Sequence, residues 1–266
     1  MSAVAVDHLA LILERKAREN ARRRRHVHAL ELTGEDRGAR AIAALRRPAG
    51  APPRILAEIK HASPSAGVLR PRAPGGGAAI ARAYEEAGAA AISVLADAPG
   101  FLGTPLDVRR AVRAVSVPVL FKEFVLDEAQ IALARAMGAS MVLLLVRALD
   151  DARLAALVGA AHAAGLAPVV EAADAEELAR ALRTGASIVG VNARDLRSFS
   201  LDPERAAAAL REVPEDRVAV YMSGVESPEG LARVAGGRAD AVLVGTSLMR
   251  APSPGAQLRA LLMEGG

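Results

Sequence analysis

The sequence predicts an α/β fold, a (β/α)8 or TIM barrel with an N-terminal helical extension, from two regularities. Eight short runs rich in Val, Ile and Leu alternate with alanine-rich amphipathic segments, repeating every ~20 to 35 residues. Four units end in a Gly just before the next apolar run: EAGAAAISV, AMGASMVLL, AAGLAPVVE and RTGASIVGV. An open doubly wound sheet is the competing fold, but it usually has fewer strands. Eight units in 266 residues fit the barrel.

The predicted elements begin with a charged, helix-rich segment over residues 4–47, which the proline-rich stretch 48–53 ends. We therefore expect an extension over 1–48 and a barrel over 49–266, together forming one domain. The predicted strands are 54–60, 90–95, 118–124, 140–146, 167–172, 187–192, 217–223 and 240–245. Helical segments such as AAIARAYEEAGA and DEAQIALARAMGA lie between them.

Composition limits the class of protein. Hydrophobic residues make up 52% of the chain but aromatic residues only 2%, so Ala, Val, Leu and Ile must build the core. The absence of cysteine excludes disulfides, thiolate metal sites and a cysteine nucleophile. Glu14, Arg15 and Lys16 interrupt the first apolar run, and no apolar run reaches ~18 residues. We therefore expect a cytoplasmic protein with neither a signal peptide nor a membrane span.

The most basic patch is Arg22 to Arg25, in a chain with a formal net charge of +4. A nucleic-acid interface is one interpretation of the patch, and a solvated helix face is the other. No aromatic platform for base stacking accompanies it, so we favour the solvated face and expect no nucleic-acid partner.

Charged side chains recur where the predicted strands end. Glu58 and Lys60 point the same way in RILAEIK, because strand side chains alternate between faces. Lys122, Glu171 and Asn192 end the third, fifth and sixth runs on the inward face. Barrel active sites lie at the carboxyl ends of the strands. Independent ion pairs are the alternative, but four strands delivering such groups to one rim favour a functional site.

Two loops predict a phosphate site. Gly224 follows the seventh run, and Gly245-Thr246-Ser247 follows the eighth, ahead of a short helix at SLMR. Barrels often bind phosphate with these two loops and a helix N-terminus, where glycine lets the backbone approach the anion. Ordinary turn glycines are the alternative, which the order of the two signals disfavours. Ser63, just after the first run, adds a hydroxyl or backbone donor.

No metal or cofactor is predicted. His162 lies within an alanine-rich helix, and His61 is expected to alternate away from Lys60, so neither receives a catalytic role. No residue spacing resembles a metal site. No GxGxxG or P-loop pattern supports a nucleotide cofactor.

From about residue 50 onward the chain resembles the indole-3-glycerol phosphate synthase family. The matching segments are AEIKHASPSAG, AISVLADAPGFLG, PVLFKEFVLDEAQI, GASMVLLLV, VVEAADAEEL, GVNARDL and AVLVGTSLMR. The resemblance implies a cofactor-free, tryptophan-biosynthetic conversion of 1-(2-carboxyphenylamino)-1-deoxyribulose 5-phosphate to indole-3-glycerol phosphate. The ring closes, and carbon dioxide and then water are lost. The implied partner is this phosphorylated small molecule, and we expect a monomer or weak homo-oligomer.

The resemblance also implies roles for individual residues. The catalytic positions are Glu58, Lys60, Lys122 and Glu171, assisted by Asn192 and Ser223. Lys122 is implied to polarise or protonate the ribulose carbonyl, and Lys60 to hold the anthranilate carboxylate or act in dehydration. Glu58 and Glu171 are implied to supply the remaining proton transfers. The implied binding positions are Ser63, Phe101, Phe124, Arg194, Leu196, Gly224, Gly245 and Thr246. Among these, the two phenylalanines form apolar walls, and Arg194 and Leu196 belong to the motif Asn-x-Arg-Asp-Leu.

The chain departs from the family pattern at two positions. Glu123 replaces an Asp after Lys122 and is expected to face outward. Met222 replaces a glutamate in a Ser-Glu-Ser-Gly motif, which removes an inward carboxylate. We therefore expect a more positive mouth with a lowered lysine pKa, preserved binding and slower proton transfer. A paralogue acting on a modified anthranilate, a phosphoribosyl isomerase and a degenerate sugar-phosphate-binding barrel are the alternatives.

Overall fold

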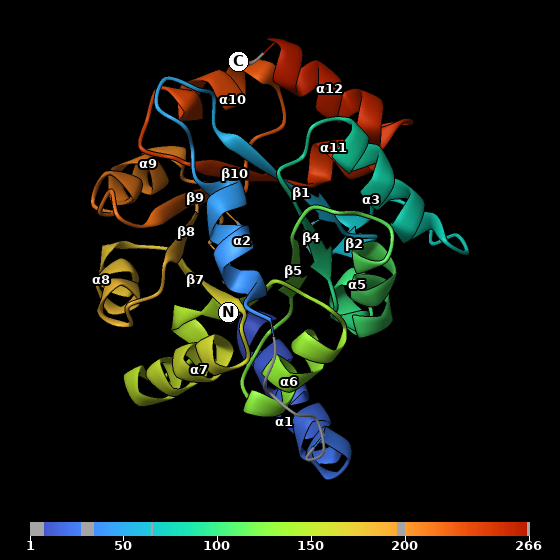
Figure 1. The fold of residues 1–266 in the computed structure, drawn as a ribbon, viewed down its shortest axis with the longest axis vertical. Helices are drawn as coiled ribbons and strands as arrows, with labels where there is room; N and C mark the ends of the chain where they lie inside the picture. The colour runs from blue at the N-terminus through green and yellow to red at the C-terminus, as the bar shows by residue number, and fades with distance from the viewer. Residues whose placement is uncertain (1–7, 28–34, 65, 196–199, 265–266) are drawn as a thin grey trace, which may run out of the picture.

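A closed barrel of eight parallel strands forms the centre of the computed structural model, which describes residues 8–27, 35–64, 66–195 and 200–264 (Figure 1). Around the barrel the strand order is β1-β10-β9-β8-β7-β6-β5-β4. The strands are β1 (Arg54–Ile59), β4 (Ala91–Leu95), β5 (Val119–Lys122), β6 (Met141–Leu145), β7 (Ala167–Ala172), β8 (Ile188–Asn192), β9 (Val218–Met222) and β10 (Ala241–Val244). Each falls within one predicted run, so the predicted fold is confirmed.

Helices surround the barrel and return the chain from each strand to the next (Figure 1). They are α3 (Gly76–Glu86), α5 (Pro105–Val112), α6 (Glu128–Ala136), α7 (Asp151–Ala163), α8 (Ala175–Arg183), α9 (Pro203–Arg211), α10 (Pro228–Ala235) and α12 (Pro254–Glu264). Four of them begin at an aspartate whose carboxylate accepts a backbone N–H of the first turn: Asp127, Asp150, Asp174 and Asp202. The glycines that end the predicted units have positive φ: Gly88, Gly138, Gly165 and Gly185.

Alternation along the strands divides the core in two. On β1, Ile55, Ala57 and Ile59 face the helices, whereas Leu56 belongs to the cluster inside the barrel. The inner cluster also contains Leu120, Met141, Val169, Ile188, Val220 and Leu243. The same alternation turns Glu58 inward above Leu56.

The two N-terminal helices lie at opposite ends of the barrel. Helix α2 (Arg37–Leu45) closes the amino end, where Ala41 and Leu45 join the inner cluster and Gly38 lies against the start of β7 (Figure 1). Helix α1 (His8–Val27) packs beside α6 and places Leu9 in the cluster that contains Phe124. Helix α2 therefore closes the amino end, and α1 lies against the rim residues Asp97 and Glu123 that follow β4 and β5.

Short helices and strands lie in several of the loops that follow the barrel strands. A two-stranded antiparallel ribbon of β2 (Ala62–Ser63) and β3 (Gly67–Val68), which was not predicted, follows β1. Helix α4 (Ala98–Phe101) follows β4, and the 3₁₀ turn η1 (Val146–Ala148) follows β6. Helix α11 (Thr246–Arg250) is the short helix predicted at SLMR. Within the described ranges, no helix has the length and apolar character needed to cross a membrane.

Candidate active site

A cavity of about 290 Å³ opens at the carboxyl ends of the strands, and all eight strands contribute to its lining. Thirteen of the fourteen predicted site residues line it: Glu58, Lys60, Ser63, Phe101, Lys122, Phe124, Glu171, Asn192, Arg194, Ser223, Gly224, Gly245 and Thr246. Leu196, the fourteenth, lies outside the described residues. The predicted convergence on one rim is therefore present in the structure.

The four charged side chains form two ion pairs in the mouth. Lys60 Nζ lies 2.8 Å from Glu58 Oε1, and Lys122 Nζ lies 3.3 Å from Glu171 Oε2. The other oxygen of Glu58 accepts a hydrogen bond from the Ser93 hydroxyl at 3.3 Å. Both glutamate side chains are almost fully buried, at 3% and 4% exposed, whereas the lysine side chains are 15% and 16% exposed. The lysine side chains are thus more accessible than their carboxylate partners.

Asn192 connects one ion pair to the next loop. Its amide nitrogen donates to Glu171 Oε1 at 2.8 Å, and its amide oxygen accepts from the backbone N–H of Arg194 at 2.9 Å. Glu171 therefore holds a lysine with one oxygen and an amide with the other. This arrangement fixes the carboxylate between Lys122 and Asn192.

Neighbouring charges shift the pKa of two groups in the mouth, Lys122 and Glu58. Burial alone would lower the pKa of Lys122, but the charges of Glu171 and Glu58 outweigh it and raise the pKa above the usual lysine value. Burial alone would raise the pKa of Glu58, but Lys60 and Lys122 hold it below its usual value. The expectation of a lowered lysine pKa is therefore wrong for Lys122, because two carboxylates remain close enough to compensate for Met222.

The loops after β9 and β10 have unusual backbone geometry. Ser223 and Gly224 are both left-handed, with φ of 71° and 81°. A serine in this region is strained, and such strain is typical of functional sites. At Gly245, a Cβ atom would lie 2.8 Å from Glu58 Oε1, so only glycine allows the loop this close to the carboxylate. The buried Ser247 hydroxyl has no hydrogen-bond partner in the described part of the chain.

Two phenylalanines form an aromatic pair at one side of the mouth. The ring centroids of Phe101 and Phe124 are 6.2 Å apart, with the planes tilted by 38°. Leu95, Leu143, Leu145 and Leu243 line the cavity as well. Apolar walls with a few charged groups suit a ligand that combines a flat ring with anionic substituents.

The two departures from the family pattern have different surroundings. Met222 points into the inner cluster and is 1% exposed. A Cβ at Gly190 on the neighbouring strand would lie 2.5 Å from Met222 Cε, so the glycine makes room for the thioether. Glu123, expected to face outward, is buried under α1, where its Oε2 lies 2.9 Å from Lys16 Nζ.

Sequence reasoning missed two kinds of residue. Arg250 and Glu226 line the mouth. Arg250 lies four residues after Thr246 on α11, and this spacing, which places both on one helix face, was a usable signal. Lys16 and Asp97 form an ion pair at 2.7 Å beside the mouth. No local pattern links them, because they are far apart in the chain.

The remaining candidates lie apart from the mouth. His61 is buried, with Nδ1 3.1 Å from the Arg70 carbonyl oxygen, and does not line the cavity, while His162 is exposed on α7. Arg22 is exposed on α1, whereas the side chains of Arg23 to Arg25 lie outside the described part. Among the described residues, no group of three His, Cys, Asp or Glu side chains is arranged to hold a metal ion.

Comparison with known proteins gives a consistent result. A family model described as Indole-3-glycerol phosphate synthase matches residues 9–261. The indole-3-glycerol phosphate synthase of Micrococcus luteus is 46% identical over 207 residues, covering 78% of this chain and 76% of that protein. The one from Koribacter versatilis is 41% identical over 208 residues, covering 78% and 79%. Thiamine phosphate pyrophosphorylase from Pyrococcus furiosus superposes with a TM-score of 0.59 at 16% identity, covering 79% of this chain and 94% of that one, a likeness of fold alone.

Proposed function

Since the chain belongs to the indole-3-glycerol phosphate synthase family of tryptophan-biosynthetic carboxy-lyases, we propose that the barrel mouth is its ring-closing site. The substrate is 1-(2-carboxyphenylamino)-1-deoxyribulose 5-phosphate, and the products are indole-3-glycerol phosphate, carbon dioxide and water. The observation that carries the proposal is the Lys122–Glu171 pair at 3.3 Å, in a cavity that also contains an aromatic pair and two glycine-bearing loops.

The substrate lies across the mouth with its phosphate at the loops after β9 and β10. Backbone N–H groups around Gly224, Gly245 and Thr246 donate hydrogen bonds to the phosphate oxygens, and Arg194 and Arg250 add positive charge. The aromatic ring lies against Phe101 and Phe124 at the other side of the cavity. Ser63 and Leu196 complete the binding positions, and Ser223 assists the catalytic residues. In this proposal the extension 1–48 and the barrel 49–266 form one domain.

The first chemical step joins the aromatic ring to the sugar. The ring carbon that bears the carboxylate attacks the ribulose carbonyl carbon, and Lys122 gives its proton to the carbonyl oxygen. The raised pKa of Lys122 keeps the ammonium protonated for this role. Carbon dioxide then leaves from the same ring carbon, and its bonding electrons return to the ring system.

The second step removes the new hydroxyl group as water. A proton must reach the departing oxygen, and another must leave the forming indole ring. The two carboxylates, Glu58 and Glu171, serve these transfers, each through the lysine that it contacts. Lys60 holds the anthranilate carboxylate before decarboxylation or acts in the dehydration. Asn192 keeps Glu171 in place.

The proposal is tested with purified protein and the carboxyphenylamino substrate, without added metal or nucleotide. With a substrate carrying ¹³C in its carboxylate, we expect one equivalent of ¹³CO₂ for each indole-3-glycerol phosphate formed. Binding of the substrate without release of ¹³CO₂ would instead support a sugar-phosphate-binding barrel without activity.

A ring-substituted substrate is the second candidate, and buried Met222 is the observation that favours it, because it gives the cavity an apolar surface. Higher kcat/KM for a methyl- or chloro-substituted ring than for the plain ring identifies that case. A cytoplasmic location and a monomeric or weakly associating chain belong to the same proposal. Cell fractionation tests the location, and sedimentation over a range of concentrations tests the association.

A further inference from the structure

Lysine is rare in this chain and is placed selectively. Three of the 34 basic residues are lysines, and two of them, Lys60 and Lys122, line the mouth. The third is Lys16 on α1, which is 1% exposed. Arginine carries a broad planar fork, whereas lysine presents a compact point charge. At position 16 the chain therefore has a compact ammonium group, although most of its basic residues are arginines.

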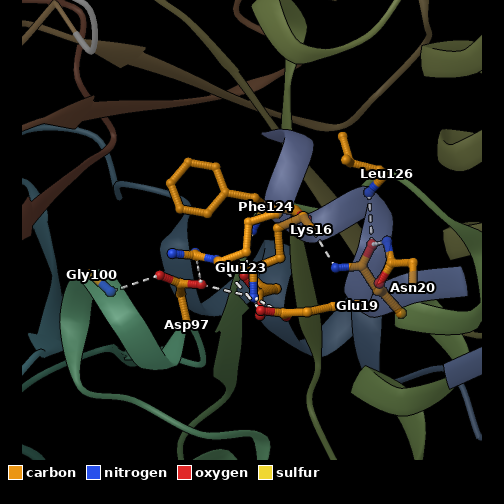
Figure 2. Close-up of polar contacts among 10 residues, drawn as sticks. Lys16, Glu19, Asn20, Asp97, Gly100, Glu123, Phe124 and Leu126 are labelled. Atoms are coloured by element: carbon orange, nitrogen blue, oxygen red, sulfur yellow. Dashed lines mark hydrogen bonds and ion pairs between the residues drawn. The ribbon is translucent and has the colours of Figure 1, made fainter. Parts of the chain in front are cut away.

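The ammonium of Lys16 contacts carboxylates from three segments (Figure 2). Its Nζ lies 3.0 Å from Glu19 on the same helix, 2.7 Å from Asp97 after β4, and 2.9 Å from Glu123 after β5. Arg15 also reaches Asp97, at 2.6 Å. Burial alone would lower the pKa of Lys16, but Glu123 and Asp97 outweigh it and raise the pKa. The ammonium thus joins α1 to two segments of the barrel rim.

Each rim carboxylate uses its second oxygen to hold the backbone beside a phenylalanine of the mouth (Figure 2). Asp97 Oδ2 accepts from the N–H of Gly100 at 3.2 Å, and Gly100 directly precedes Phe101 at the end of α4. Glu123 Oε1 accepts from the N–H of Phe124 at 2.8 Å. Lys16 is therefore connected through Asp97 to the backbone next to Phe101, and through Glu123 to the backbone of Phe124.

A second side chain of α1 holds Phe124 from the other side. Asn20 donates to Gln130 Oε1 at 2.7 Å, and Gln130 donates to the carbonyl oxygen of Phe124 at 2.9 Å. Leu126 N–H also donates to Gln130 Oε1, at 2.8 Å. Lys16 and Asn20 are four residues apart, so they share one face of the helix. Both backbone polar groups of Phe124 are thereby bound to side chains that α1 contacts.

We propose that Lys16, supported by Asn20, is a positioning residue for the ring-closing reaction, and that it sets the spacing of Phe101 and Phe124 around the substrate's aromatic ring. This assignment of the ring rests on the proposed function. Without the ammonium, the buried carboxylates of Asp97 and Glu123 would repel one another, and the two rim segments would separate. Buried ion pairs contribute little net stability in general, so geometry is the property that this cluster determines.

The test compares Lys16→Met with Arg18→Met, which removes an exposed cation paired with Glu14 on the same helix. Both proteins are labelled with 4-fluorophenylalanine, whose four positions in the chain are distinguishable by ¹⁹F NMR after single Phe→Leu assignments. We expect Lys16→Met to move the Phe101 and Phe124 resonances. Phe121, which packs outside the barrel, serves as the internal reference and should not move.

Kinetics provide the second readout. We expect Lys16→Met to raise the KM for the carboxyphenylamino substrate about tenfold with kcat within about twofold, as for lost uniform binding. The inhibition constant of inorganic phosphate, which needs no aromatic wall, should stay the same. Resonances and KM equal to those of Arg18→Met would overturn the proposal, as would equal weakening of phosphate and substrate.

A milder variant covers the case in which Lys16→Met does not fold. Asn20→Ala removes a neutral side chain and so leaves no charge unpaired. We expect it to move the ¹⁹F resonance of Phe124 but not that of Phe101. An unchanged Phe124 resonance would overturn the proposal. If the unaltered protein forms no indole-3-glycerol phosphate, the proposed function fails. The ¹⁹F shifts in Lys16→Met still decide whether Lys16 sets the spacing of the aromatic pair.

Discussion

The ammonium of Lys122 on β5 lies 3.3 Å from the carboxylate of Glu171 on β7, across the inner face of β6, which separates the two strands. A contact between non-neighbouring strands is possible only inside the barrel, where side chains from several strands meet. An acid and a base are thus within reach of each other before any substrate binds.

Gly245→Ala should impair turnover without unfolding the protein. The added Cβ would lie 2.8 Å from Glu58 Oε1, so the carboxylate must leave its place beside Lys60. Displacement of about 1 Å in an active site can reduce the rate ~10²-fold, and we expect a loss of this order in kcat/KM. Gly159→Ala is the matched control, because its new Cβ meets nothing within 4 Å in the middle of α7. The control should add ~0.5–1 kcal/mol to the free energy of unfolding with unchanged kinetics. Equal kinetics in both variants would contradict the proposed packing.

Sulfate and inorganic phosphate should compete with the substrate and bind between the loops after β9 and β10. Ser223, Gly224, Gly245 and Thr246 line the cavity there, and Thr246 begins α11, where backbone N–H groups of a first helical turn suit an anion. Crystals soaked in sulfate provide the check, together with competitive inhibition by phosphate. Density at the Arg22–Arg25 patch and none at these loops would count against the assignment.

Met222→Glu should raise the turnover number and shift the basic limb of the pH profile upward. A carboxylate at this position adds a negative charge to the cavity that contains Lys122, which favours the charged lysine. Met222→Gln has the same length without the charge and separates the electrostatic effect from the change in packing. If Met222→Glu turns over no faster than Met222→Gln, the site is adapted to the thioether instead.

The titration of two lysines should differ from that of a free side chain. Lys16 and Lys122 both have a pKa raised above 10.5 by nearby carboxylates, despite burial. A lysine of this kind stabilises the folded state fully below pH 10.5, and the stabilisation is lost as the pH rises through the folded-state pKa. Selective ¹⁵Nζ labelling suits a chain with three lysines, and we expect two midpoints above 10.5. The difference in unfolding free energy between wild type and Lys16→Met should shrink at higher pH. A midpoint below 10.5 for either lysine would contradict the close approach of its carboxylate partners.

The part of the site that depends on local order was predictable from sequence. Alternation along a strand sufficed to place Glu58 and Lys60 on one face, and the structure pairs them at 2.8 Å. The glycines that end the repeated units were recognisable because positive φ restricts the residue type, as at Gly88 and Gly138. The same rules located all eight strands.

The part that depends on distant contacts was not predictable. Glu123 was expected to face outward, but its partner Lys16 lies 107 positions away in sequence. No spacing rule connects a helix at one end of the chain to a rim carboxylate. The β2–β3 ribbon was missed for a different reason, since two residues per strand are too few to show alternation. The raised pKa of Lys122 likewise needed the distances to Glu171 and Glu58.

The most direct test is the rate of indole fluorescence produced from the carboxyphenylamino substrate by wild type and by Lys122→Ala. We expect wild type to form indole-3-glycerol phosphate without a cofactor. Lys122→Ala should be slower by ~10²–10⁴-fold, as for the loss of a general acid, with an unchanged circular dichroism spectrum. Absence of product from the wild type would contradict the assignment of the mouth as a ring-closing site. Turnover by folded Lys122→Ala within about threefold of wild type would contradict the role of Lys122.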